Sequence, residues 1–103
     1  MSVRLERWNP ADGPLTEKRL MRIMEFEGYD VLVFTYRPGT RFTGHEHAQP
    51  KCDAVLEGVL RVTADGQSFD LRKGDRLYVP AGTPHTAEVV GETTVVSLDG
   101  TMW

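Results

Sequence analysis

Residues 74–85 read GDRLYVPAGTPH and form the most informative segment of the chain. Gly74 and Asp75 are a turn signal, and the four residues after them include the aliphatic and aromatic side chains that favour strands. Two prolines and a glycine then interrupt the strand before His85. The segment therefore predicts a short strand between two tight turns, with a histidine placed where the next strand begins.

The same pattern of short strands and turns continues on both sides of this segment. Runs of strand-forming residues lie at 53–57, 59–63, 68–71, 85–90 and 93–98. Turns that contain glycine separate most of these runs, and Asp65-Gly66 is the strongest hairpin signal among them. Short strands at close and regular spacing predict an antiparallel β-sandwich or β-barrel.

The first third of the chain adds two strands and one helix. Residues 3–8 alternate apolar and charged side chains, which indicates a half-buried strand. Between Thr16 and Gly28, apolar residues recur at spacings of three and four, which predicts one short helix with these two residues at its ends. In residues 29–36, both alternating sets of positions, one for each face of a strand, are too apolar for a surface strand. We therefore expect a strand that is buried on both faces.

The composition is that of one globular domain. The 103 residues (11.6 kDa) are 40% hydrophobic and 26% charged, which predicts a single domain over residues 1–103. A formal charge of -3 and a pI near 5.5 argue against a nucleic-acid-binding protein. Cys52 is the only cysteine, so no intrachain disulfide can form. No run is apolar enough for a membrane span or a signal peptide, which makes the cytoplasm the expected location.

Three histidines are candidate metal ligands. His45 and His47 stand two positions apart, so on a strand their imidazoles would project from the same face. His85 would approach them from another strand. Neutral imidazole is the commonest metal ligand in proteins, and three imidazoles leave coordination positions open. A His-x-His pair is also common without a metal, so these residues alone do not establish a site.

Two motifs of the chain resemble those of the cupin superfamily, in particular its small single-domain members. The first motif has a glycine, five residues, His-x-His and a closing glycine, represented here by Gly39, His45, His47 and Gly58. The second has a glycine, five residues, Pro-x-Gly, two residues and a histidine, represented here by Gly74, Pro80, Gly82 and His85. The resemblance covers roughly residues 30–98.

The resemblance implies a jelly-roll β-barrel that holds a metal in its mouth. The implied ligands are His45, His47 and His85, and the implied metal is a divalent transition ion, namely Zn, Fe, Ni, Mn or Cu. The implied activity is that of a dioxygenase acting on a small anionic or chelating substrate, with its catalytic residues unassigned. The alternatives are a non-catalytic binding or sensing module with a structural metal, and an isomerase or epimerase. Cupins commonly pair, so a homodimer is expected.

The chain departs from the first motif at the usual fourth ligand, a glutamate, where it has Lys51. An inward-pointing Lys51 would hold a substrate carboxylate, but lysine more often extends its charge to water. Asp53 lies two positions after Lys51, on the same face of the expected strand. It is a candidate for an ion pair with Lys51 or for the metal ligand that replaces the glutamate. Cys52 is a candidate soft ligand, although strand alternation favours the opposite face and an ordinary buried thiol. Tyr78 is a further candidate for the lining of the barrel.

Overall fold

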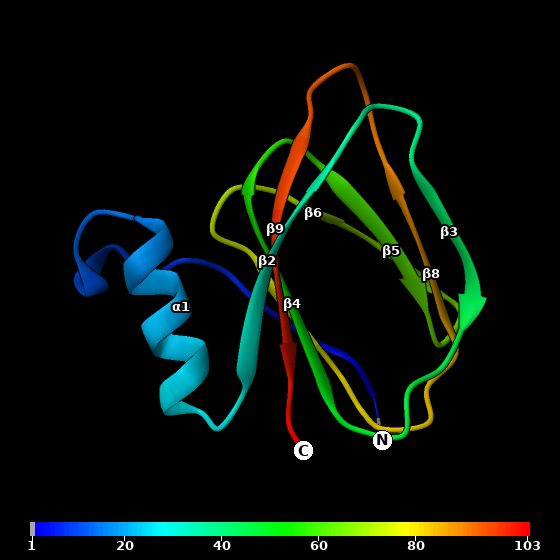
Figure 1. Cartoon of the computed structure of the whole chain (residues 1–103), viewed down its shortest axis with the longest axis horizontal. Coiled ribbons are helices and arrows are strands. Elements are labelled where there is room, and N and C mark those ends of the chain that lie inside the picture. Colours follow the sequence, from blue (N-terminus) through cyan, green and yellow to red (C-terminus); the bar gives the residue numbers. More distant parts are fainter. Residues whose placement is uncertain (1) are drawn as a thin grey trace.

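The computed structural model describes residues 2–103, apart from the side chain of His45. Within this range, nine strands form two sheets that face each other, and a short helix lies outside them (Figure 1). This arrangement confirms the predicted all-β, antiparallel jelly-roll barrel with one helix near its N-terminus. In the described range, no helix combines the length and the hydropathy needed to cross a membrane.

The larger sheet has five strands in the order β1-β7-β4-β9-β2. Their bounds are β1 Arg4–Glu6, β7 Arg76–Val79, β4 Lys51–Glu57, β9 Val95–Thr101 and β2 Asp30–Tyr36. The smaller sheet has four strands in the order β3-β8-β5-β6. Their bounds are β3 Arg41–His45, β8 His85–Val89, β5 Leu60–Ala64 and β6 Gln67–Leu71. The two strands at whose ends the motif histidines His45 and His85 lie are therefore neighbours in the smaller sheet.

Strand β4 lies at the centre of the larger sheet, between β7 and β9. Successive side chains of a strand point to opposite faces of the sheet. Lys51, Asp53 and Val55 therefore point into the barrel. Cys52 and Ala54 point outward, toward the helix. Both faces of β4 are thus covered, one by the smaller sheet and the other by the helix.

Aliphatic side chains fill much of the barrel interior. The buried members of this cluster are Val55, Leu60, Val62, Leu71, Leu77, Val79, Val89 and Val95. Burial of one such side chain is worth about 1.5–3 kcal/mol, so the cluster holds the two sheets together. The remaining interior space is left to polar side chains, which are described with the site below.

Helix α1 (Glu17–Phe26) covers the outer face of the larger sheet (Figure 1). Thr16 caps it as predicted, because its hydroxyl oxygen accepts a backbone N–H of the first turn at 3.1 Å. Leu20 and Met24 are fully buried and pack against Leu98 of β9. The helix is therefore held by its apolar face, and it keeps the outward side chains of β4 and β9 away from water.

Two turns show why the sequence requires glycine at particular positions. Asp65 and Gly66 form the predicted hairpin between β5 and β6, and their φ angles of 53° and 76° are the two positive values of a type I′ turn. Gly74 precedes β7 with φ 90°. A Cβ atom at Gly74 would lie 2.7 Å from Cβ of Trp8, so this glycine permits both the turn and the close packing of Trp8.

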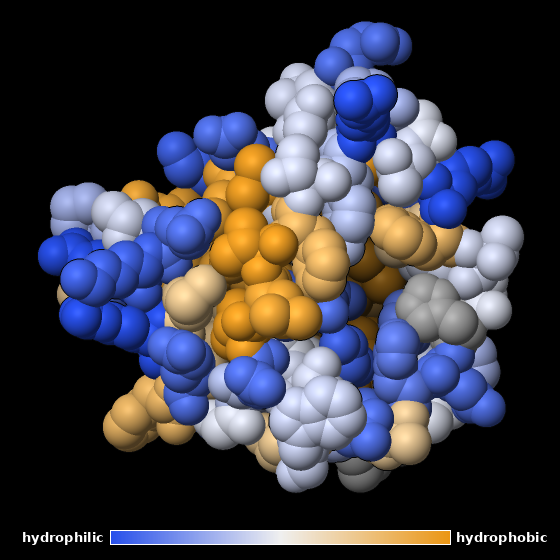
Figure 2. Space-filling model, viewed as in Figure 1, coloured by the Kyte–Doolittle hydropathy of each residue, from blue (hydrophilic) through white to orange (hydrophobic). Residues whose placement is uncertain are grey.

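Strand β2 differs from the prediction made for residues 29–36. The sequence predicts burial on both faces, but β2 lies at the edge of the larger sheet and pairs with β9 among the described strands. Leu32, Val33 and Phe34 are 61%, 41% and 39% exposed. Figure 2 shows apolar residues gathered on this side of the molecule, over β2. An edge strand has one sheet neighbour, so its side chains remain partly in water whatever their parity.

Candidate metal centre and its cavity

A cavity of about 160 Å³ lies inside the barrel, between the two sheets. Figure 2 shows the surface hollowed beside the apolar residues over β2. The lining of the cavity consists of Tyr36, Phe42, His47, Lys51, Asp53, Leu60, His85, Ala87, Ser97 and Asp99. Among the described side chains, no histidine lines the two largest hollows, of about 360 and 530 Å³, and a hollow of about 200 Å³ is lined by His85 without His47. The 160 Å³ cavity therefore combines two motif histidines with three further ionisable side chains, namely Lys51, Asp53 and Asp99.

His47 and His85 reach the cavity from the smaller sheet. His85 is the first residue of β8, its register partner on β3 is His45, and His47 lies two positions beyond the end of β3. The ring centres of His47 and His85 are 5.4 Å apart, with 38° between the ring planes. The backbone N–H of Gly82 donates to the carbonyl oxygen of His47 at 2.8 Å, which ties the two motifs together. The side chain of His45, the third predicted ligand, lies outside the described part of the structure.

His85 is oriented by its own turn. The residue is 5% exposed, and Nδ1 lies 2.9 Å from the carbonyl oxygen of Thr83. A carbonyl oxygen only accepts hydrogen bonds, so Nδ1 is protonated and the lone pair of the neutral ring is on Nε2. Histidines that bind metals commonly donate their other N–H group to such a carbonyl. The turn over residues 80–84 therefore fixes the orientation of the His85 ring.

The two described imidazoles fit one divalent metal ion. Metal–nitrogen bonds of about 2.0–2.1 Å place the ring centres of two imidazoles on one ion roughly 5 Å apart. The separation of His47 and His85 is close to this value. Among the described side chains, which leave out that of His45, no three histidine, cysteine, aspartate or glutamate residues are grouped for metal binding. The ligand that would complete the predicted set is thus the one whose side chain is not described.

Lys51 points into the barrel, unlike the more common lysine whose charge extends to water. It is 7% exposed, its Nζ lies 2.8 Å from Oδ1 of Asp99, and it donates to Oγ1 of Thr101 at 2.7 Å. Asp53 was a candidate partner for this ion pair, and the partner of Lys51 is Asp99. The reason is the register of the two strands, since β9 places both Thr101 and Asp99 beside the lysine.

Asp53 and Asp99 stand directly opposite each other on β4 and β9. Two carboxylates at directly opposite positions of neighbouring strands repel each other, which favours a proton on one of them. Burial, followed by the negative charge of Asp99, raises the pKa of Asp53 to about 7, and Lys51 offsets part of this effect. Asp53 therefore keeps its proton at pH values at which an ordinary aspartic acid side chain has already lost it.

Aromatic rings of the two edge strands meet at the cavity. The ring of Tyr36 on β2 contacts that of Phe42 on β3 edge-on, with 4.9 Å between the centres. Burial, followed by the negative charges of Asp99 and Asp53, raises the pKa of Tyr36 to about 12. The Tyr36 hydroxyl is therefore neutral at physiological pH, and it faces the carboxyl pair as a hydrogen-bonding group without charge.

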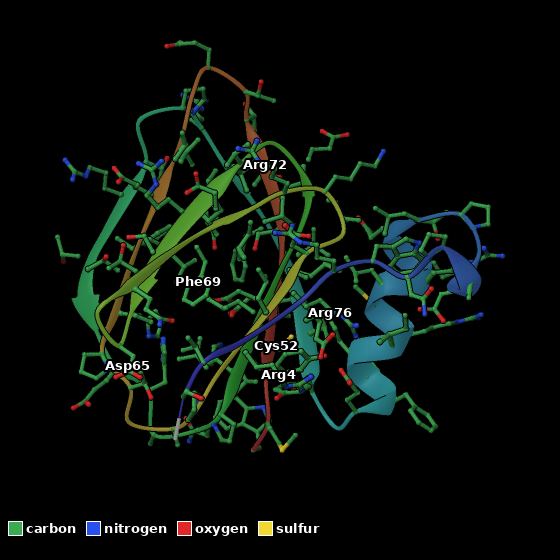
Figure 3. The ribbon with its side chains drawn as sticks, turned by 180° about the vertical axis from the view of Figure 1, so that it is seen from behind. Arg4, Cys52, Asp65, Phe69, Arg72 and Arg76 are labelled. Carbon is green, nitrogen blue, oxygen red and sulfur yellow. The ribbon has the colours of Figure 1, made fainter. Side chains whose placement is uncertain are left out.

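Cys52 and Tyr78 lie on the other face of the larger sheet, and Figure 3 shows Cys52 on the side near the helix. Cys52 is fully buried there, and burial raises the pKa of its thiol. The Tyr78 hydroxyl donates a hydrogen bond to the carboxylate of Glu27 at the end of the helix. Of the four additional residues proposed from the sequence, Lys51 and Asp53 thus line the cavity, whereas Cys52 and Tyr78 do not.

Asp99 is the cavity residue that the sequence interpretation missed. Residues 95–101 read VVSLDGT, in which Ser97, Asp99 and Thr101 share one parity. Polar side chains at every second position of an otherwise apolar strand indicate a polar interior face. Whether this polar face lines a site depends on which strands lie beside β9 in the sheet. The order of strands in a sheet cannot be read from their spacing in the sequence.

Comparisons with known proteins agree with the two motifs. The family model for the cupin domain matches residues 32–100. An uncharacterised protein of Methanocaldococcus jannaschii is 35% identical over 54 residues, which are 52% of this chain and 43% of that protein. Quercetin 2,3-dioxygenase of Bacillus subtilis is 31% identical over 67 residues, which are 64% of this chain and 20% of that enzyme. The chain therefore spans less than half the length of either relative.

Solved structures share this fold. Acireductone dioxygenase from Bacillus anthracis, with a cadmium ion in its active centre, matches with a TM-score of 0.73 at 18% identity. That match covers 98% of this chain and 78% of the enzyme's chain. Oxalate decarboxylase of Bacillus subtilis matches with a TM-score of 0.64 at 26% identity, over 73% of this chain and 22% of the other. The first of these matches includes the helix and both sheets, since it covers nearly the whole chain.

Proposed function

The chain belongs to the cupin family, and we propose that it is a metal-dependent enzyme of the dioxygenase type that acts on a small anionic or chelating substrate. The proposed metal ligands are His45, His47 and His85. The observation that carries the proposal is the proximity of His47 and His85 in the cavity, with the ring of His85 oriented by the Thr83 carbonyl. Imidazole ligands suit Zn, Fe, Ni, Mn and Cu, so the proposal extends to all five metals.

The side chains around the histidines have distinct roles in this proposal. A divalent metal, when bound, supplies a Lewis acid with open coordination positions for a chelating substrate. Three neutral imidazoles leave the charge of such an ion uncompensated, which favours an anionic partner. Lys51 uses two of its three N–H donors on Asp99 and Thr101, and the third can donate to a substrate oxygen.

The size of the cavity restricts the substrate. Its volume of about 160 Å³ is below the range of roughly 300–1,000 Å³ that is usual for pockets of drug-sized ligands, so a small molecule is expected. Two proteins similar to this chain are named as dioxygenases, which supports a reaction of this type. Because the chain corresponds to 20% of quercetin 2,3-dioxygenase, this support concerns the type of reaction and not the substrate.

Metal content tests the proposed ligands. Protein purified without chelators should contain about one equivalent of metal by elemental analysis. His47→Ala and His85→Ala should each reduce this amount at least tenfold, because each variant loses a ligand. Cys52→Ala is the matched control on the far face of the sheet and should keep its metal. Full metal content in both histidine variants would contradict the site.

Oxygen consumption tests the reaction. Iron-loaded protein is mixed with a small β-diketone or a small thiol, and dissolved oxygen is followed with an electrode. We expect consumption that requires one of these compounds and that is lost in His85→Ala. A protein with its full metal content and no oxygen consumption would favour the alternative of a non-catalytic binding module with a structural metal.

The apolar edge of the larger sheet supports the expected homodimer. We propose that β2 pairs antiparallel with β2 of a second copy, which would cover Leu32 and Val33 and continue the sheet across the two chains. Asp30 at one end of the strand would then approach the partner's Arg37, so the pairing is complementary in charge. Light scattering should give the mass of a dimer for the wild type and of a monomer for Leu32→Lys. A monomeric wild type would contradict this pairing.

A further inference from the structure

The cavity contains a pair of carboxyl groups that the proposed metal site does not use. Asp53 and Asp99 are cross-strand partners and line the same cavity as His47 and His85. Lys51 forms its ion pair with Asp99 at 2.8 Å. Two carboxyl groups and one ammonium group are therefore gathered on the wall that belongs to the larger sheet.

The charges of this wall indicate which carboxyl group carries the proton. The Lys51 ammonium compensates the carboxylate of Asp99, which lies 2.8 Å away. A second carboxylate at Asp53 would stand beside the first without a cation of its own, which is unfavourable in a poorly solvated site. The proton therefore belongs on Asp53, the member of the pair that has no ion pair with Lys51. The raised pKa of Asp53 agrees with this assignment.

We propose that Asp53 is a proton donor to the small anion that binds in this cavity, and that Lys51 and Asp99 position its proton. The proposal rests on the proposed function, since it takes the substrate to be an anion beside His47 and His85. In the step, the O–H bond of Asp53 breaks and a new O–H bond forms on the substrate. The substrate loses one negative charge, and Asp53 gains it. Asp53 then recovers a proton from water.

Several ionisable groups face Asp53 from the surrounding strands. Lys51 lies on the same strand, Asp99 on β9 and Tyr36 on β2, and the two histidines approach from the smaller sheet. Burial keeps Tyr36 neutral at physiological pH. Imidazoles also exchange protons near neutral pH, so a pH profile of activity would not separate them from Asp53. A test must therefore detect the carboxyl proton itself.

Infrared spectroscopy detects this proton because a protonated carboxyl group absorbs separately from a carboxylate. We expect metal-loaded wild-type protein at about pH 6, where ordinary carboxyl groups are ionised, to show a protonated-carboxyl band that Asp53→Asn abolishes. Asp70→Asn is the matched control and should keep the band. Asp70 also pairs with a cation, Arg61 at 2.7 Å, but the hydrogen bond from Arg61 lowers the pKa of Asp70. Malonate, a small dianion, should shift the wild-type band, since the proposal places the anion against Asp53.

Two results would overturn the proposal. One is a band that survives in Asp53→Asn. The other is a wild-type band that malonate leaves unchanged, whether malonate fails to bind or binds elsewhere. His85→Ala separates this proposal from the metal site, because it should lose the metal and keep the carboxyl band. A chain that binds no metal in any form, but shows a malonate-sensitive Asp53 band, would refute the metal-dependent function and leave the proton donor in place.

Discussion

The two faces of β4 are both covered, but by different chemistry. Cys52 and Ala54 meet the helix in a cluster of apolar side chains, where stabilisation comes from burial alone. Lys51 and Asp53 meet the cavity, where each polar group depends on a particular partner on β9. An apolar face tolerates other side chains of similar volume at small cost. A buried ion pair does not, because removal of one member leaves the other charge without compensation.

This difference supports the proposed site on the inner face. On the outer face, Cys52, Ala54 and Leu98 are fully buried against the helix, so these three side chains are out of reach of a ligand. The inner face keeps Asp99 27% exposed to the cavity, so its groups remain within reach of a small molecule. Substitutions on the two faces should therefore lower the free energy of unfolding by different amounts, and the pH dependence of this loss should also differ.

Lys51→Met should have the largest pH-dependent effect on stability. It leaves Asp99 in the barrel without its cation, which should lower the free energy of unfolding near pH 8 by about 3 kcal/mol, at the low end for a broken buried pair because Asp99 is partly exposed. Lys51 also lowers the pKa of Asp53, so its removal raises that pKa further. A carboxyl group with a raised pKa in the folded chain stabilises the fold at low pH and loses this effect as the pH rises through the folded pKa. Urea unfolding should therefore show a smaller loss near pH 5 than near pH 8.

Leu98→Ala is the matched control on the outer face. Leu98 is fully buried against the helix, and its truncation should cost roughly 2–5 kcal/mol. The lost contacts are apolar, so the same cost is expected near pH 5 and near pH 8. If Lys51→Met lowered the free energy of unfolding by the same amount at pH 5 and pH 8, as Leu98→Ala is expected to do, the inner face would not be stabilised by its ion pair.

The parts of the molecule that were predictable from the sequence have local signals. The Asp65-Gly66 hairpin, the Thr16 cap and the turns around residues 74–85 each depend on residues that are neighbours in the chain. The positions of His47 and His85 followed from the spacing of two motifs. In each of these features, particular residue types favour one backbone conformation, so the sequence pattern was enough to predict the structure.

The polar wall and the exposed edge were harder to predict because both depend on the order of strands in a sheet. Lys51 by itself resembles a lysine that extends to water, and it becomes a cavity residue because β9 places Asp99 beside it. Strand β2 is apolar on both parities, as a central strand would be, and its exposure follows from its position at the end of the sheet. Neither the pairing of β4 with β9 nor the edge position of β2 can be predicted from the spacing of residues along one strand.

Cys52→Ala should have the smallest effect, a loss of about 1 kcal/mol in the free energy of unfolding with no change in metal content. The thiol is fully buried, and burial raises its pKa, so the reactive thiolate is scarce in the native chain. A thiol reagent should therefore label the native protein only as fast as the chain unfolds, and label the urea-unfolded protein at once. Rapid labelling of the metal-free native chain that added metal suppresses would place the sulfur at the metal, and the separation of the two faces of β4 would then be wrong.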